Sequence, residues 1–219
     1  MTGAYRLVVF DWDGTLADSH ARIVRTVTSA IEAMDLPARS EAAIRGIIGL
    51  GMREATEALY PGEGEAMHQR FLAHYRERWS REAREPVALF AGAHRTLAHL
   101  DTAGLLLAVA TGKGRRGLDR ELAESDTTRF FVATRTVDES PSKPHPGMVL
   151  ELMEEVGCAP EETLVVGDTT FDLQMARAAG AHALGVASGA HPAAALLECR
   201  PVALLDTVAE LPAWLIRRG

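Results

Sequence analysis

A short apolar run that ends in two closely spaced aspartates constrains the fold of this chain more than any other feature. The run RLVVF, residues 6–10, stands directly before Asp11 and Asp13. A short, continuous apolar run is typical of a strand that is buried on both faces of a parallel sheet. We therefore expect an α/β fold in which a buried strand brings two carboxylates to one edge of the sheet.

The chain from residue 87 onward alternates between helix and strand patterns. Helices are predicted at 92–103, at 115–124, from Pro146 to Gly157 and at 170–179, and strands at 105–111, 130–134, 163–168 and 182–187. The last segment, 206–218, has a helical pattern that Pro212 interrupts and restarts. This alternation predicts parallel strands joined by right-handed crossovers.

Residues 17–86 carry helical patterns only. Asp18 or Ser19 can cap a first helix, whose apolar side chains recur at three- to four-residue spacing until Pro37 ends the pattern. Further helices are predicted at 40–48, 52–59 and 64–82, and the last of them carries the apolar stripe Met67, Phe71, Tyr75 and Trp79. We interpret this stripe as the core of a helical unit.

These patterns together predict the fold class and the domain organisation. The 219 residues, 47% of them hydrophobic, are enough for one large core that carries a smaller unit. We expect residues 1–16 and 87–219 to form a doubly wound, parallel-sheet Rossmann-like core, into which residues 17–86 are inserted as an all-helical cap domain.

The composition argues against several classes of function. Lys and Arg number 23 and Asp and Glu 30, a net charge of -7, so no basic field attracts nucleic acid. The sequence has neither a signal-peptide pattern nor about 18 consecutive apolar residues, so we expect a cytoplasmic protein without a membrane segment. Cys158 and Cys199 lack CxxC spacing and are predicted to be reduced and structural. Monomer and homodimer both remain open.

Polar side chains follow four of the predicted strands. They are Asp11 and Asp13 after the first, Thr111 after the second, Lys143 in the loop after the third, and Asp168 with Asp172 after the fourth. Taken singly, each fits a turn, a strand end, a helix start or a solvated charge. Ligands of open α/β sheets bind at the carboxyl ends of the strands, so the set as a whole predicts one shared site.

The chemistry of this set points to phosphoryl transfer. Two unit charges 4 Å apart repel by about 4 kcal/mol at an effective dielectric of 20, so four carboxylates in one crevice require a cation. Oxygen ligands without cysteine or paired histidine favour Mg²⁺. Thr111 and Lys143 offer a hydroxyl and a compact positive charge to phosphoryl oxygens. No serine or cysteine stands next to a base, so a carboxylate is the available nucleophile.

The order and spacing of these residues resemble the four motifs of the haloacid dehalogenase superfamily. The matching stretches are DWDGT at 11–15, Thr111, Lys143 within SKPHP, and GDTTFD at 167–172, and they span nearly the whole chain. A helical insertion between the first two motifs resembles the phosphoglycolate phosphatase-like group. The resemblance implies a Mg²⁺-dependent phosphatase that acts on a small phosphorylated metabolite.

The resemblance also implies a role for each motif residue. Asp11 would attack phosphorus, and Asp13 would protonate the leaving alkoxide and then activate water. Thr111, Gly112 and Lys143 would bind the substrate and its phosphoryl group. The implied Mg²⁺ ligands are Asp11, the backbone carbonyl of Asp13, and Asp168, with Asp172 in a supporting position.

The same face of the extended segment holds both acidic residues of the first motif. Residues two apart on an extended segment point to one side, so the expected proton donor lies beside the nucleophile and Trp12 between them points into packing.

Rival functions within and beyond the family differ at single positions. Superfamily dehalogenases lack the second aspartate of the first motif, which is present here, and phosphonate hydrolases use a cap lysine, whereas residues 17–86 contain none. Sugar phosphomutases share both aspartates and the cap, so they remain the main alternative enzyme. A sensor that binds Mg²⁺ and a phosphorylated ligand without turnover is the alternative from another class.

The predicted cap offers one candidate for substrate recognition. Gly46, Gly49 and Gly51 break the helical pattern, so the loop there can reach the site, and Arg53 can bind a substrate carboxylate. Alternatively Arg53 pairs with Glu57, four residues on. Lys113 is interpreted as a helix-start residue.

None of the eight histidines forms a recognised motif. They are interpreted as surface or packing residues, and His145, flanked by prolines, as part of a rigid turn that presents Lys143.

Overall fold

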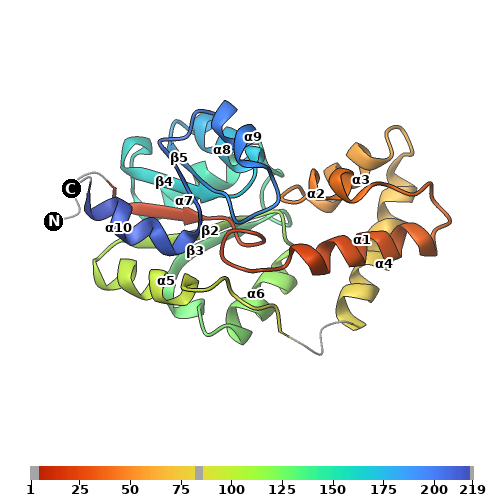
Figure 1. Ribbon diagram of the computed structural model, residues 1–219, viewed down its shortest axis with the longest axis horizontal. Helices are drawn as coiled ribbons and strands as arrows, with labels where there is room; N and C mark the ends of the chain where they lie inside the picture. Colours follow the sequence, from red (N-terminus) through yellow and green to blue (C-terminus); the bar gives the residue numbers. More distant parts are fainter. Residues whose placement is uncertain (1–4, 82–85, 218–219) are drawn as a thin grey trace.

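A six-stranded parallel sheet is the framework of one half of the molecule (Figure 1). The computed structural model describes residues 5–81 and 86–217. In spatial order the strands are β3 (Phe131–Thr136), β2 (Leu106–Thr111), β1 (Leu7–Phe10), β4 (Thr163–Gly167), β5 (His182–Val186) and β6 (Ala203–Leu205). All neighbouring strands are parallel, and β1 pairs with β2 on one side and with β4 on the other. The order reverses at β1, which is where open α/β sheets form their binding crevice.

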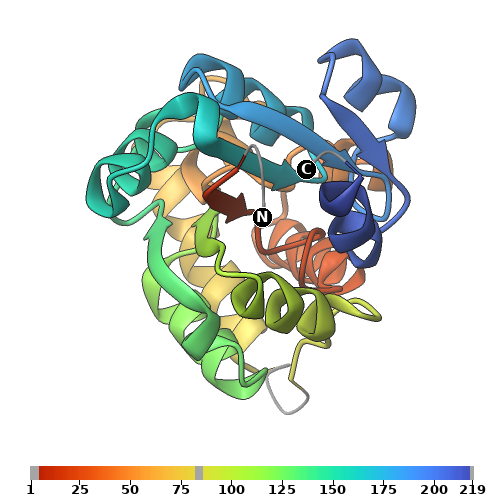
Figure 2. The same cartoon turned by 90° about the vertical axis from the view of Figure 1, so that its left-hand side faces the viewer.

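Alternate residues of β1 are buried in two different apolar clusters. Val8 and Phe10 pack on one face, and Leu7 and Val9 pack on the other. The first face is covered by α5 (Ala93–Thr102), α6 (Arg115–Glu124) and α10 (Leu211–Ile216), and the second by α7 (Gly147–Val156), α8 (Thr170–Ala178) and α9 (Ala193–Glu198). Figure 2 shows helices on both sides of the sheet. The expected doubly wound α/β core is confirmed.

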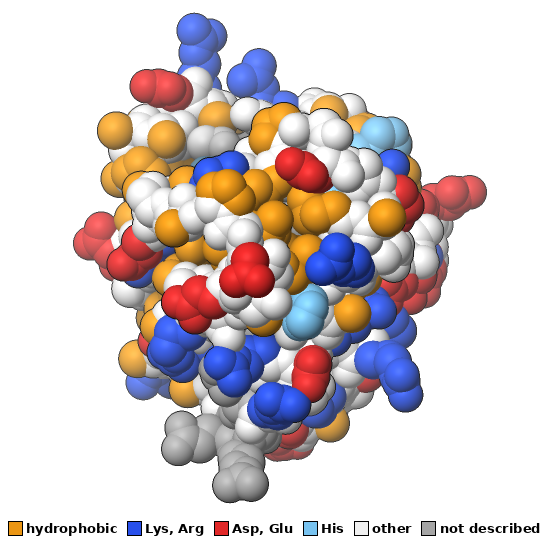
Figure 3. All heavy atoms as spheres, turned by 90° about the vertical axis from the view of Figure 1, so that its right-hand side faces the viewer, with side chains coloured by type: hydrophobic (Ala, Val, Ile, Leu, Met, Phe, Trp, Pro, Cys, Tyr) orange, Lys and Arg blue, Asp and Glu red, His pale blue; other side chains and the backbone are white. Residues whose placement is uncertain are grey.

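The remaining helices form a separate unit, here called the helical insertion, beside the carboxyl ends of the strands (Figure 1). It consists of α1 (His20–Ala33), α2 (Glu41–Arg45), α3 (Met52–Leu59) and α4 (Glu65–Arg81). A third apolar cluster, which includes Ile23, Val27 and Phe71, holds these helices together. Its outer face gathers hydrophobic side chains between acidic and basic ones (Figure 3). The end of the predicted helix at residue 82 lies outside the described residues.

The predicted and observed elements differ in two ways: two short elements were not predicted, and one helix is shorter than predicted. β6 and α9 were not predicted, because three and six residues are too short to show a clear period. Pro212 lies in the first turn of α10, as expected, and residue 218 is outside the described part. The helix predicted at 40–48 is only the five residues of α2, since the chain leaves the helix at Gly46.

Three short 3₁₀ segments complete the chain trace. They are η1 (Thr128–Phe130), η2 (Pro160–Glu162) and η3 (Val208–Glu210). Cys158 and Cys199 are free thiols, as expected. Among the helices of the described residues, none combines the length and the apolar character needed to cross a membrane.

Replacing Phe71 with alanine tests the separate core of the helical insertion. The Phe71 side chain is fully buried, so we expect Phe71→Ala to lower the free energy of unfolding by about 3–5 kcal/mol in urea titrations. Leu150 on α7 is 45% exposed and serves as the control. Leu150→Ala should change the free energy of unfolding by less than about 0.5 kcal/mol. Equal effects of the two variants would contradict this description of the core.

Candidate active site

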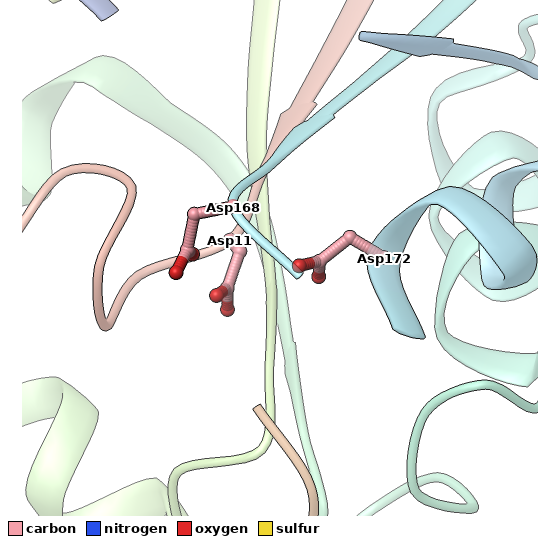
Figure 4. Close-up of side chains that lie close together, drawn as sticks. All are labelled: Asp11, Asp168 and Asp172. Carbon is pink, nitrogen blue, oxygen red and sulfur yellow. The ribbon is translucent and has the colours of Figure 1, made fainter. Parts of the chain in front are cut away.

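Three buried carboxylates meet where β1 and β4 end (Figure 4). Phe10 is in register with Val166, so Asp11 and Asp168 leave neighbouring strands at nearly the same level. Asp172 reaches the same place from the first turn of α8. One ligand oxygen from each of the three side chains lies within 4.8 Å of the others. The convergence predicted from the sequence is therefore present for these three residues.

The ammonium group of Lys143 bridges two of these carboxylates. Its Nζ lies 2.5 Å from Asp11 Oδ1 and 2.6 Å from Asp172 Oδ1, and the side chain is fully buried. Burial alone would lower the pKa of Lys143, but the carboxylates of Asp11 and Asp172 outweigh it and raise the pKa. Burial also raises the pKa of Asp11, against the opposing effect of Lys143. The lysine thus remains charged and compensates part of the acidic cluster.

The donors around the cluster leave one oxygen of Asp11 unpaired. Asp168 accepts hydrogen bonds from Thr15 Oγ1 (2.9 Å) and from the backbone N–H of Ala190 (2.7 Å). Asp172 Oδ2 accepts from Thr169, the N-cap of α8. In contrast, Asp11 Oδ2 is buried and has no hydrogen-bond partner among the described residues.

This donor set fits a magnesium ion. Carboxylate oxygens are the ligands that Mg²⁺ prefers, and an unpaired buried oxygen is an available ligand atom. The Asp13 side chain is not part of the three-carboxylate cluster.

The Asp13 carboxylate, outside the three-carboxylate cluster, is held by two donors. Ser19 Oγ donates to Oδ1 at 2.6 Å. Ser19 is the N-cap residue of α1, as the sequence allowed, but its side chain makes no capping hydrogen bond. Lys113 Nζ lies 3.1 Å from Oδ2. The interpretation of Lys113 as a helix-start residue is wrong, because its side chain is only 9% exposed and reaches into the site. Its second partner is Glu121.

A loop of the helical insertion lies directly against the end of β2. A Cβ atom on Gly112 would fall 2.5 Å from the carbonyl oxygen of Gly49 and 2.7 Å from that of Leu50, so only glycine permits this approach. The backbone N–H of Gly51 donates to Ser142 Oγ at 2.7 Å. The glycine-rich loop therefore reaches the site, as predicted. Thr111, next to Gly112, is buried, and its Oγ1 accepts from the backbone N–H of Lys113.

Comparison with known proteins decides the family. Residues 8–186 match the model of the haloacid dehalogenase-like hydrolases, which is most of the chain. The chain belongs to this family. A probable phosphatase of Dickeya dadantii, IndB, is 35% identical over 211 residues, covering 94% of this chain and 91% of the relative. The phosphoglycolate phosphatase of Yersinia pestis is 30% identical over 213 residues, covering 95% and 92%.

Solved structures agree with this membership at the level of the fold. A hydrolase from Pseudomonas syringae superposes with a TM-score of 0.88 over 96% of this chain and 97% of its own, at 24% identity. This haloacid dehalogenase-like hydrolase therefore shares the fold of that structure over nearly its whole length.

A cavity of about 800 Å³ lies between the helical insertion and the sheet of this hydrolase. The core contributes Asp11, Asp13 and Thr111 to its wall, and the insertion contributes apolar side chains such as Ile23 and Trp79. Such a volume lies within the range of small-molecule sites.

Arg53 lines the cavity at an exposed position. Its Nε lies 3.0 Å from Glu65 Oε2, and its side chain is 70% exposed. The alternative pairing with Glu57 is wrong, because Glu57 contacts His68. The Arg53 side chain can therefore turn toward a ligand without breaking a buried contact.

Two polar residues beside the site were not predicted. His20, read as a surface or packing residue, is buried with its Nε2 3.4 Å from Asp168 Oδ2. Glu121 is buried beneath Trp12 and accepts a hydrogen bond from its Nε1 at 2.7 Å. The only sequence signal for Glu121 was its position on the inner face of the helix at 115–124, where a charged residue is out of place.

Magnesium should stabilise the folded protein through the three-carboxylate cluster. At a Mg²⁺ concentration about 100 times the Kd, linkage gives about 2.7 kcal/mol, and each kcal/mol raises Tm by about 2–4 °C. We expect Asp168→Asn to remove most of this shift in thermal unfolding. Asp101→Asn, an exposed change on α5, is the control and should keep the shift. The account of the cluster is wrong if the two variants respond alike to Mg²⁺.

Proposed function

We propose that this hydrolase is a Mg²⁺-dependent phosphatase that hydrolyses a small phosphorylated metabolite through an aspartyl phosphate. The observation that carries the proposal is the state of Asp11. Its carboxylate is buried at a strand end, lines the cavity, and keeps one oxygen free of hydrogen bonds while Lys143 holds the other. A fixed carboxylate with one free oxygen is suited to nucleophilic attack.

The reaction divides between the two aspartates of the first motif. Asp11 attacks phosphorus, the bond to the leaving oxygen breaks, and Asp13 gives its proton to that oxygen. Asp13 then takes a proton from water, the water attacks phosphorus, and Asp11 and inorganic phosphate are released. Thr111, which lines the cavity, and Lys143, which holds the Asp11 carboxylate, would bind phosphoryl oxygens.

The metal would be held at the three-carboxylate cluster. Asp11 and Asp168 would be its ligands, with Asp172 in support. The backbone carbonyl of Asp13 would be a further ligand, as the family resemblance implies. A bound Mg²⁺ would neutralise negative charge on the transferring group.

The substrate is proposed to be a carboxylated phosphoester such as phosphoglycolate. Relatives named phosphoglycolate phosphatase are about 30% identical over nearly the full chain, and Arg53 lies on the cavity wall. A guanidinium group pairs with a carboxylate in a bidentate manner, which would select such a substrate.

Removing the nucleophile should abolish turnover without unfolding the protein. Asp11→Asn keeps the size of the side chain, so we expect an unchanged fold by circular dichroism and a loss of at least about 10³-fold in Mg²⁺-dependent phosphate release from p-nitrophenyl phosphate. Near-normal turnover by this variant would rule out an aspartyl phosphate at Asp11. Tight binding of phosphoesters by the unmodified protein, with no turnover, would support a sensor instead.

Arg53→Ala should act on the KM of carboxylated substrates alone. We expect KM for 2-phosphoglycolate to rise by roughly 10-fold, the loss of one charge-assisted contact, while KM for p-nitrophenyl phosphate is unchanged. Arg70→Ala, an exposed change on α4, serves as the charge-matched control. An unchanged KM for 2-phosphoglycolate would remove Arg53 from the site.

A panel of sugar phosphates in the same assay distinguishes a phosphatase from the alternative enzyme, a sugar phosphomutase. Isomerised sugar phosphate without release of inorganic phosphate would identify a mutase.

A further inference from the structure

Lys113 is a buried cation that the proposed chemistry leaves without a role. Its ammonium group lies 3.1 Å from Asp13 Oδ2 and 3.1 Å from Glu121 Oε1. Burial alone would lower its pKa, but the two carboxylates raise it, so the group is charged. A lysine has three donors, and the two carboxylates account for two of them. Lys113 therefore holds one oxygen of the Asp13 carboxylate while it is itself held by Glu121.

Glu121 anchors this lysine from the sheet side. Both of its oxygens are used, one by Lys113 and the other by the Trp12 indole N–H at 2.7 Å. A buried carboxylate is costly unless it is paired, and burial does raise the pKa of Glu121. Apolar side chains would pack this position of α6 at lower cost. Because an apolar residue would cost less at this position, the buried Glu121 carboxylate indicates that its purpose is to hold the Lys113 ammonium group in place.

Trp79 covers the same ammonium group from the helical insertion. Lys113 Nζ lies 4.6 Å from the centroid of the Trp79 ring, a distance at which a cation is attracted to an aromatic face. Trp79 also stacks on Tyr75 and receives the guanidinium of Arg22. The ring belongs to α4, whereas Lys113 and Asp13 belong to the core. The contact therefore forms only when the insertion lies against the sheet.

Ser19 provides the second fixed donor to Asp13. Its hydroxyl lies on the opposite oxygen, Oδ1, at 2.6 Å. Two donors on two different oxygens fix the plane of a carboxylate as well as its position. Loss of Lys113 would leave Asp13 held at one oxygen and free to rotate.

We propose that Lys113, anchored by Glu121 and covered by Trp79, is a positioning residue that orients the Asp13 carboxylate for proton transfer to the leaving oxygen. This inference rests on the proposed phosphatase function and on Asp13 as its acid. Because Trp79 completes the arrangement from the insertion, Asp13 is oriented most firmly when the insertion lies against the core.

The leaving group of the substrate distinguishes this role from a general structural one. An alkyl phosphate needs a proton on its leaving oxygen, whereas p-nitrophenolate departs without one. The value of kcat/KM reports the steps up to release of the alcohol. We expect Lys113→Met to lower kcat/KM for an alkyl phosphate by roughly 10- to 100-fold, which is part of the usual contribution of a general acid. For p-nitrophenyl phosphate the same variant should lower kcat/KM by less than about 3-fold.

Two further variants keep the test independent of folding. Glu121→Gln keeps a hydrogen-bonding side chain, and Trp79→Leu removes only the aromatic cover. Both should show the same selective loss, smaller than that of Lys113→Met. Full activity on p-nitrophenyl phosphate is itself the proof that a variant is folded. Arg95→Met, which removes an exposed cation on α5, outside the cavity wall, is the control and should not change the ratio of the two kcat/KM values.

The outcomes separate the two proposals. Equal losses on both substrates in all three variants would overturn the positioning role and leave the phosphatase proposal intact. An unmodified protein that hydrolyses neither substrate in the presence of Mg²⁺ would overturn the phosphatase proposal itself.

Discussion

The ion pairs of Lys143 with Asp11 and Asp172 are the interaction on which the rest of the site depends. Three buried carboxylates whose oxygens lie within 4.8 Å of one another would repel strongly without a positive charge among them. The ammonium group contacts two of the three and leaves Asp11 with a free oxygen. Removing one partner of such a buried pair costs about 3–5 kcal/mol, so the lysine secures both the fold and the position of the Asp11 carboxylate.

The sheet and the helical insertion supply different parts of the site. Strand ends fix Asp11 and Asp168, because a parallel sheet places the carboxyl ends of its strands on one edge. Asp172 comes from the first turn of α8, and Lys143 comes from the loop between β3 and α7. The insertion brings a loop against Gly112 and Ser142 and an aromatic ring over Lys113. The charged centre is therefore held by the half that contains the sheet, while the enclosing wall of the cavity comes from the helical insertion.

The sequence allowed the strand-end residues to be predicted, because local patterns carry them. A buried run before Asp11 and another before Asp168 are visible without any knowledge of contacts, and parallel pairing brings their ends together. The helical insertion was predictable for the same reason, since apolar spacing shows its helices. The short β6 (Ala203–Leu205) was missed because three residues show no period.

What the sequence could not show are contacts between residues far apart in the chain. Trp12 and Glu121 are 109 positions apart, and their hydrogen bond depends on how α6 packs on the sheet. The bridging role of Lys143 is of the same kind, because its partners come from β1 and α8. The contact of the buried His20 with Asp168 was not predicted, because nothing local indicates that Asp168 lies beside it. Residue type alone does not show which way a side chain points.

The central claim is that Asp11 offers its free oxygen to phosphorus beside a magnesium ion. The most direct measurement is a crystal structure of the protein with Mg²⁺ and beryllium trifluoride, a phosphoryl mimic that bonds to carboxylate oxygens. The account predicts the mimic on Asp11, with the ion held by Asp11 and Asp168. A mimic bonded to another residue, or an ion bound away from these carboxylates, would contradict it.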